Sequence, residues 1–145
     1  MRLILISLLA LAVTGCGNPD GTFNLPPGDA ERGRATFILS QCNHCHSVQG
    51  DAGVPYDGAD RAEGIHVVLG GPAARVKSYG DLVTSIINPS HKLSRGDAPG
   101  TVTETGESTM RPYNDVMTVQ ELIDLVEYLQ GQYEIWVPKQ YVYKH

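Results

Sequence analysis

Apolar side chains recur at helical spacing near the carboxy end of the chain. Between Thr118 and Gly131 they form a stripe along one face of a predicted helix. Thr118 and Glu121 have the spacing of a capping box, and Gly131 offers a stop. This pattern is the clearest helix signal in the sequence. The stripe consists of Val119, Leu122, Ile123, Leu125, Val126 and Leu129.

Two shorter stretches predict two further helices. Asp29 is a plausible N-cap for a helix that runs to about Ser40. Ser78 or Tyr79 opens the second helix, which Asn88-Pro89 stops because the residue before a proline disfavours helical backbone.

The connecting segments show no clear period. Residues 48–71 contain many glycines, so they predict a loop, and residues 90–109 are polar and turn-rich. An aromatic tail, residues 133–145, follows the last helix and includes Trp136. It could pack back as an extended arm or serve as a contact surface.

The amino terminus is typical of an export signal. Arg2 precedes an apolar run too short to span a bilayer comfortably, and small residues follow. Val13-Thr14-Gly15-Cys16 resembles the lipobox of bacterial lipoproteins. The resemblance implies that residues 1–15 are removed as a signal peptide and that Cys16 is lipidated. Residues 16–28 predict a tether, because they show no apolar periodicity and are rich in glycine and proline. The alternatives are an uncleaved anchor or an ordinary cleavage site, and either places the rest of the chain outside the cytoplasm. Gly17 would be the second residue of the mature lipoprotein. By resemblance to lipoprotein sorting signals, a glycine rather than an aspartate there favours the outer membrane.

Charge narrows the range of partners. The chain has 11 basic and 16 acidic residues and a formal net charge of −5. Nucleic acid is therefore not an expected partner, since its binding depends on neutralising phosphates with Lys and Arg. A negative surface is compatible with a basic face on a periplasmic or membrane redox protein.

Cys42-Asn43-His44-Cys45-His46 is the candidate chemical site. Cys-x-x-Cys-His is the attachment signature of a c-type haem, in which two sulfurs bond to the porphyrin vinyl groups and the histidine binds iron. The spacing lets the thiols of Cys42 and Cys45 reach neighbouring vinyls, and His46 then lies beneath the metal. His44 should be exposed at the haem edge.

The cysteine count agrees with this reading. Of three cysteines, Cys16 goes to lipid and the other two to haem, which leaves none for a disulfide. Zinc at Cys42 and Cys45 would need further ligands that the nearby histidines cannot supply without strain. A thioredoxin-like redox pair would need βαβ units, and no such pattern is present.

Residues 29–132 resemble the monohaem class I c-type cytochromes in the order of their elements. This order is helix, Cys-x-x-Cys-His, loop, helix, Met-containing loop, helix. The resemblance implies an all-α cytochrome c fold, in which three to four short helices and long loops wrap around one covalently bound haem. In that family a helix glycine and an aromatic one turn later face a leucine and an aromatic of the last helix. Gly33, Phe37, Leu125 and Tyr128 match this pattern. The alternative is an incidental helix glycine.

The same resemblance makes Met110 the candidate distal ligand. Met110-Arg111-Pro112-Tyr113 is similar to the family's run of methionine, proline and an aromatic, with one position altered. A thioether raises the reduction potential relative to a second imidazole. Met110 could instead be a packing residue, with His91 or His66 as the ligand.

The family also has a Gly-Pro pair whose carbonyl accepts the N–H of the proximal imidazole. Gly64-Ile65 lies at the matching distance and Gly71-Pro72 has the matching letters. The acceptor is therefore left unassigned.

The expected function is electron transfer by a lipid-anchored, periplasm-facing carrier with one haem c. The sequence shows no identifiable nucleophile–base pair or paired-carboxylate site, so we do not expect a stand-alone enzyme. Two alternatives stay open: an electron-entry subunit of a larger reductase or dehydrogenase complex, and a gas-binding or peroxidatic haem protein.

Overall fold

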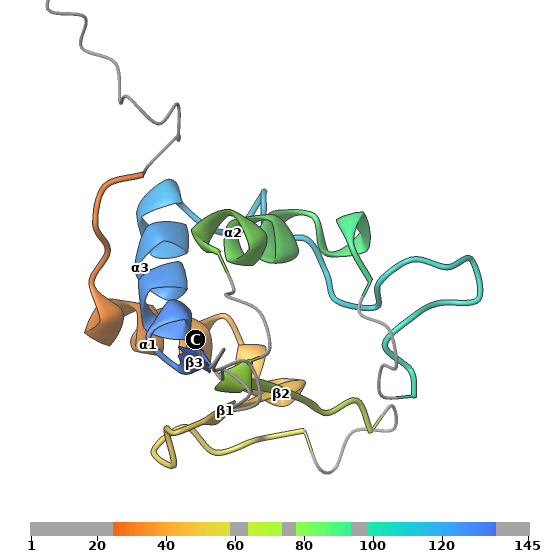
Figure 1. The fold of residues 1–145 in the computed structure, drawn as a ribbon. Coiled ribbons are helices and arrows are strands. Elements are labelled where there is room, and N and C mark those ends of the chain that lie inside the picture. The colour runs from red at the N-terminus through yellow and green to blue at the C-terminus, as the bar shows by residue number, and fades with distance from the viewer. Residues whose placement is uncertain (1–24, 59–63, 74–77, 94–98, 136–145) are drawn as a thin grey trace, which may run out of the picture.

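The computed structural model describes residues 25–58, 64–73, 78–93 and 99–135. Three α-helices lie above a small sheet in the view of Figure 1. The helices are α1 (Ala30–Leu39), α2 (Tyr79–Ile87) and α3 (Val119–Gln130), with 3₁₀ turns η1 (Cys42–His44) and η2 (Pro89–His91). The strands are β1 (His46–Gln49), β2 (Val67–Ala73) and β3 (Tyr133–Ile135).

The predicted helices are confirmed, including their caps. The Asp29 carboxylate accepts the backbone N–H of Arg32 at 2.9 Å at the start of α1. Ser78 opens α2 and Thr118 opens α3, each through a complete capping box. These caps satisfy backbone donors that have no partner within the helix.

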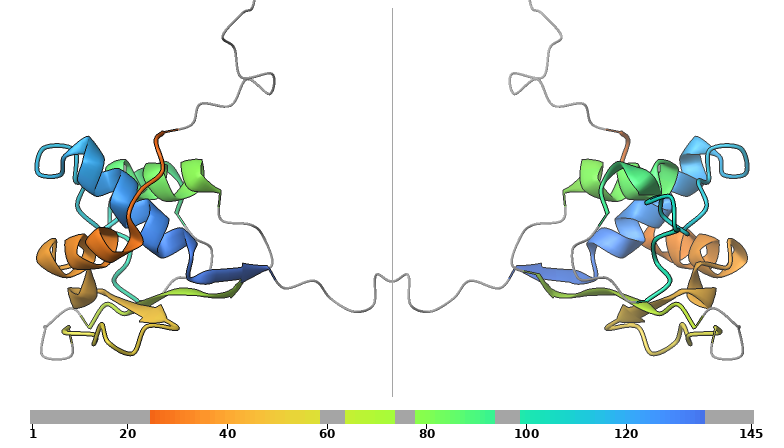
Figure 2. Two further views of the ribbon diagram at one scale, coloured as in Figure 1. Left: turned by 90° about the vertical axis from the view of Figure 1, so that its left-hand side faces the viewer. Right: turned by 90° about the vertical axis from the view of Figure 1, so that its right-hand side faces the viewer.

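Helices α1 and α3 cross closely, and they lie side by side in both views of Figure 2. A Cβ added at Gly33 would overlap the Asp124 carbonyl oxygen and lie 2.8 Å from the Tyr128 Cβ. The Phe37 ring meets the Tyr128 ring edge-on, with 6.0 Å between centroids. Leu125, only 1% exposed, lies in the same core. The crossing therefore requires a residue without a side chain at position 33.

Polar bonds also join the two helices. The buried Asp124 carboxylate on α3 accepts bonds from the Arg32 guanidinium, the Asp29 backbone N–H and the Gln120 amide. These donors, above all Arg32, hold the pKa of Asp124 down at about 2. The carboxylate thus stays charged and fixes the start of α1 against α3.

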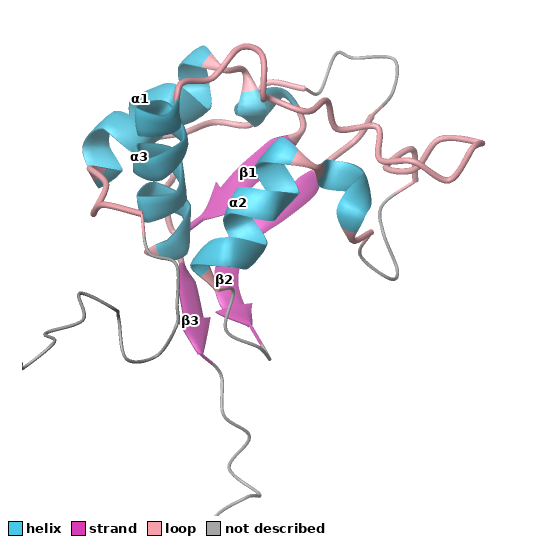
Figure 3. Ribbon diagram, turned by 90° about the horizontal axis from the view of Figure 1, so that it is seen from above, coloured by secondary structure: helices cyan, strands magenta, loops and turns pink. Residues whose placement is uncertain are grey.

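The sheet is a correction to the all-α expectation. Part of the segment predicted as loop, residues 48–71, instead forms strand structure, and all three strands run parallel in the order β1-β2-β3. His46 is in register with Val67, and Gly71 with Tyr133. Figure 3, seen from above, shows the strands β1 and β2 in magenta passing behind α2. The first residues of the predicted tail, 133–135, thus pack back against β2.

The strands escaped prediction because their pairing is non-local. Residues 46–49, 67–73 and 133–135 come from distant parts of the chain, and parallel strands need long connections that leave no local turn signal. None of the helices in the described part of the chain is long and apolar enough to cross a bilayer.

Candidate haem-attachment site

The Cys-x-x-Cys-His motif forms a tight turn directly after α1. Gln41 adopts left-handed backbone with φ of 59°, and η1 follows. The Cys45 N–H donates to the Cys42 carbonyl at 3.1 Å. Because residues three apart eclipse one another in a 3₁₀ turn, the backbone brings Cys45, the C-cap of η1, back over Cys42. Both cysteines are half-buried free thiols, so they are available for bonds to a haem.

His46 begins β1 and is oriented by β2. Its Nδ1 lies 3.2 Å from the Val67 carbonyl oxygen, and the Val67 N–H donates to the Cys45 carbonyl at 2.8 Å. A carbonyl only accepts, so Nδ1 carries the proton and Nε2 keeps a free lone pair. Burial lowers the pKa of His46, which also favours the neutral ring. The acceptor that the sequence left unassigned is Val67, two residues beyond Ile65.

A loop supports the turn from outside. The Asn43 side chain is buried and donates to the Pro55 carbonyl, while its backbone carbonyl accepts the Asp57 N–H at 2.9 Å. His44 Nε2 lies 3.2 Å from the Asp57 carboxylate, and its side chain is only 16% exposed. The expectation of an exposed His44 is therefore wrong. The cause is the packing of residues 55–58, where a Cβ at Gly58 would overlap the His44 carbonyl.

Tyr113 connects the Met110 loop, residues 110–117, to the motif. Its ring is 8% exposed, and its hydroxyl donates to the Ser40 carbonyl at 3.1 Å. Burial raises the pKa of Tyr113 to about 12 and that of the neighbouring Cys42 thiol to about 11. Both groups are consequently protonated at neutral pH. The only sequence signal for this contact was the aromatic residue Tyr113 after Met110-Arg111-Pro112.

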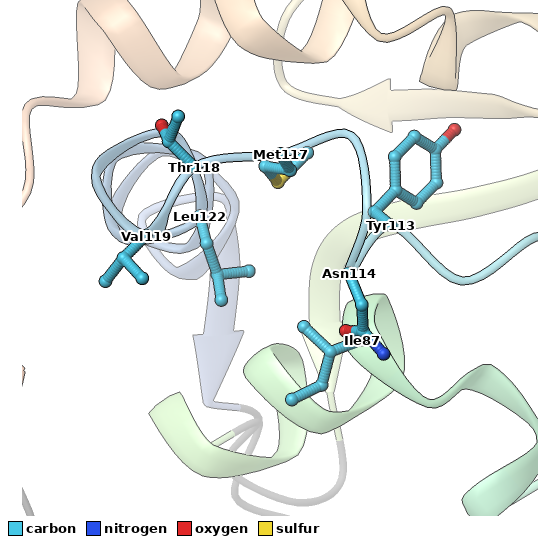
Figure 4. Close-up of a pocket in the computed structure, with 7 residues that line it drawn as sticks. All are labelled: Ile87, Tyr113, Asn114, Met117, Thr118, Val119 and Leu122. Carbon is cyan, nitrogen blue, oxygen red and sulfur yellow. The ribbon is translucent and has the colours of Figure 1, made fainter.

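Met110 is half-buried and packs against the same hydrophobic core as Cys42. Its backbone N–H is bonded to the Ser108 hydroxyl at 3.2 Å. Met117 is also half-buried, and it lines a cavity of about 190 Å³ between α2, the Met110 loop and α3 (Figure 4). Both methionines therefore contact the same hydrophobic core, and Met117 also borders the cavity.

The alternative histidine ligands have other surroundings. His66 is exposed, bonds to the Ser47 hydroxyl at 2.8 Å and stacks on Tyr56. His91 is exposed at the end of η2. Cys16 and Trp136 lie outside the described residues.

The donor set fits a covalently attached haem. Two free thiols three residues apart at a 3₁₀ turn can bond to the two vinyls, and an imidazole with Nδ1 already bonded can offer Nε2 to iron. These features define a protein of the covalent haem class. The cytochrome c family model matches residues 30–132, so the chain belongs to the cytochrome c family. It carries one covalent haem c and has a haem-based role in electron transfer. No curated protein and no solved structure gave a significant match.

Proposed function

We propose that this chain is a lipid-anchored, periplasm-facing electron carrier. In it Cys42 and Cys45 hold the haem, His46 is the proximal ligand and Met110 the distal ligand. The observation that carries the proposal is the contact between His46 Nδ1 and the Val67 carbonyl, because it leaves one imidazole nitrogen of fixed orientation free for iron. When bound, the haem supplies a one-electron iron couple.

The residues of the chain then tune that couple. The Val67 carbonyl fixes the proximal ring and increases its basicity. The thioether of Met110 is a soft ligand that favours the reduced state. Since both ligands come from packed parts of the chain, the same pair can be kept in both oxidation states, and little rearrangement accompanies each electron.

Exposed acidic side chains support docking of the carrier to a partner protein. Acidic side chains such as Asp115 and Glu134 are exposed, which suits a redox partner with a basic face. The proposed partners are periplasmic or membrane redox proteins.

Carbon monoxide tests the carrier against a gas-binding or peroxidatic protein. We expect the reduced wild-type holoprotein to bind it slowly, because the methionine must first leave. The oxidised protein should show the weak red absorption band of sulfur bound to ferric iron. Rapid binding and a missing band would contradict the proposal. A stable stoichiometric partner on purification from native membranes would instead favour the alternative of an electron-entry subunit.

The lipid anchor makes a separate prediction. The variant Cys16→Ala lacks the residue that is acylated. The haem-loaded protein should therefore be absent from the membrane fraction, and a fatty-acid precursor should no longer label it. Asn18→Ala is the matched control, because it alters the proposed tether but leaves the lipidated cysteine, and it should remain in the membrane fraction. Retention of Cys16→Ala in the membrane fraction would indicate an uncleaved anchor.

A further inference from the structure

We propose that Tyr113 is a positioning residue that holds the Met110 loop, residues 110–117, against the haem-attachment turn through its hydroxyl bond to Ser40. The inference rests on the proposed ligation by Met110. It assigns the stability of that ligation to a contact made by a residue three positions after the methionine.

Tyr113 is the anchor of its segment. Its ring is 8% exposed, and its hydroxyl reaches a carbonyl 73 residues earlier in the chain. Residues on either side of it in the loop have exposed side chains and so contribute little burial. These exposed neighbours are Arg111, Pro112, Asn114, Asp115 and Val116.

The acceptor is well suited to this bond. Ser40 caps the C-terminal end of α1, where carbonyl groups lack partners within the helix. Ser40 also lies two residues before Cys42. The bond therefore ties the Met110 loop to the backbone that leads into the first haem thioether.

The rest of the loop is fixed through Tyr113 as well. The Val116 and Met117 N–H groups donate to its carbonyl at 3.3 and 3.1 Å. The Arg111 guanidinium lies 4.9 Å from the ring centroid, within the range of a cation–π contact. The segment that begins at Met110 is thus fixed three residues later by the buried Tyr113 ring and by the Arg111 guanidinium beside it.

Packing between the Met110 loop and helices α2 and α3 is incomplete. A cavity of about 190 Å³ borders Tyr113, Asn114 and Met117 of the loop, and Ile87 of α2 and Leu122 of α3 line its opposite walls (Figure 4). Side chains that border a void lose dispersion contacts there. The hydroxyl bond to Ser40 therefore carries a larger share of the free energy that keeps the loop closed.

Tyr113→Phe keeps the ring and removes only the hydroxyl. Loss of one hydrogen bond of ordinary strength should increase the open fraction of the loop about fivefold. Two measurements on the holoprotein report this. Imidazole should displace the distal methionine of the oxidised protein, and its affinity should increase about fivefold. The loss of the red band monitors this displacement. The Val116 and Met117 amides should exchange hydrogen about fivefold faster.

Tyr128→Phe is the matched control. It also removes a tyrosine hydroxyl, which donates to Asp51 at 2.9 Å at the α1–α3 crossing, away from the Met110 loop. It should leave imidazole affinity and the loop amides at wild-type values. Equal changes in both variants would mean a general loss of stability and would overturn the role of Tyr113.

The outcomes separate the inference from the proposed function. A wild-type protein without the red band overturns Met110 ligation, and with it the ligand-positioning role. A wild-type protein with the band, together with unchanged imidazole affinity and amide exchange in Tyr113→Phe, overturns the role of Tyr113 alone.

Discussion

Replacing Met110 with alanine is expected to abolish the red sulfur-to-iron band of the oxidised holoprotein. It should also lower the reduction potential by about a tenth of a volt or more, since axial ligands set haem potentials over a range of about 0.8 V. The physical reason is the loss of a soft thioether that stabilises ferrous iron. Optical spectra and a redox titration measure both effects, and carbon monoxide should then bind the reduced protein rapidly.

Met117→Leu is the matched control for this experiment. Leucine conserves the apolar volume beside the cavity that Met117 lines and removes the sulfur. This variant should keep the red band and a potential close to that of the wild type. A band that persists in Met110→Ala and disappears in Met117→Leu would transfer the ligand role to Met117. Persistence in both variants would mean that either methionine can serve as the ligand when the other is absent.

Gly33→Leu is expected to prevent stable packing of α1 on α3. The new Cβ would overlap the Asp124 carbonyl, which is backbone and cannot rotate away. Overpacking in a well-packed core costs about 1–3 kcal/mol, occasionally more, and a bulky side chain at a backbone contact belongs at the upper end. Reduced haem loading and a lower midpoint of chemical unfolding are the measurements.

Gly80→Ala provides a control of opposite sign. Gly80 lies in the first turn of α2 and is exposed, and an added Cβ would have only the Ser78 hydroxyl as a neighbour, at 4.0 Å. Alanine should therefore stabilise the protein by up to about 1 kcal/mol through helix propensity. If Gly33→Leu kept full haem loading and wild-type stability, the crossing would not depend on the glycine.

The helices were predictable because their signals are local. Thr118 with Glu121, and Asp29 with Arg32, are three residues apart, so a cap depends on few atoms beyond its own turn. The apolar stripe of α3 likewise follows from the period of the helix. The Cys-x-x-Cys-His motif is equally local, because the reach between its sulfurs is set by one 3₁₀ turn.

The support of the site was not predictable in the same way. Val67 is selected as the acceptor for His46 by the register of two parallel strands. Any residue has a carbonyl, so no side-chain letter marks the partner. The same holds for Ser40, whose carbonyl receives the Tyr113 hydroxyl because α1 ends there. The exposure of His44 was mispredicted because the loop that covers it arrives from residues 55–58.

The sequence by itself determined the family, the haem-attachment motif, the three helices and the candidate pair of iron ligands. These depend on covalent spacing and on helical periodicity, which act over a few residues. Only the tertiary structure decided the parallel sheet, the orientation of His46 by Val67 and the contact of Tyr113 with Ser40. These depend on backbone groups from distant segments, and their pairing is chosen when the chain packs.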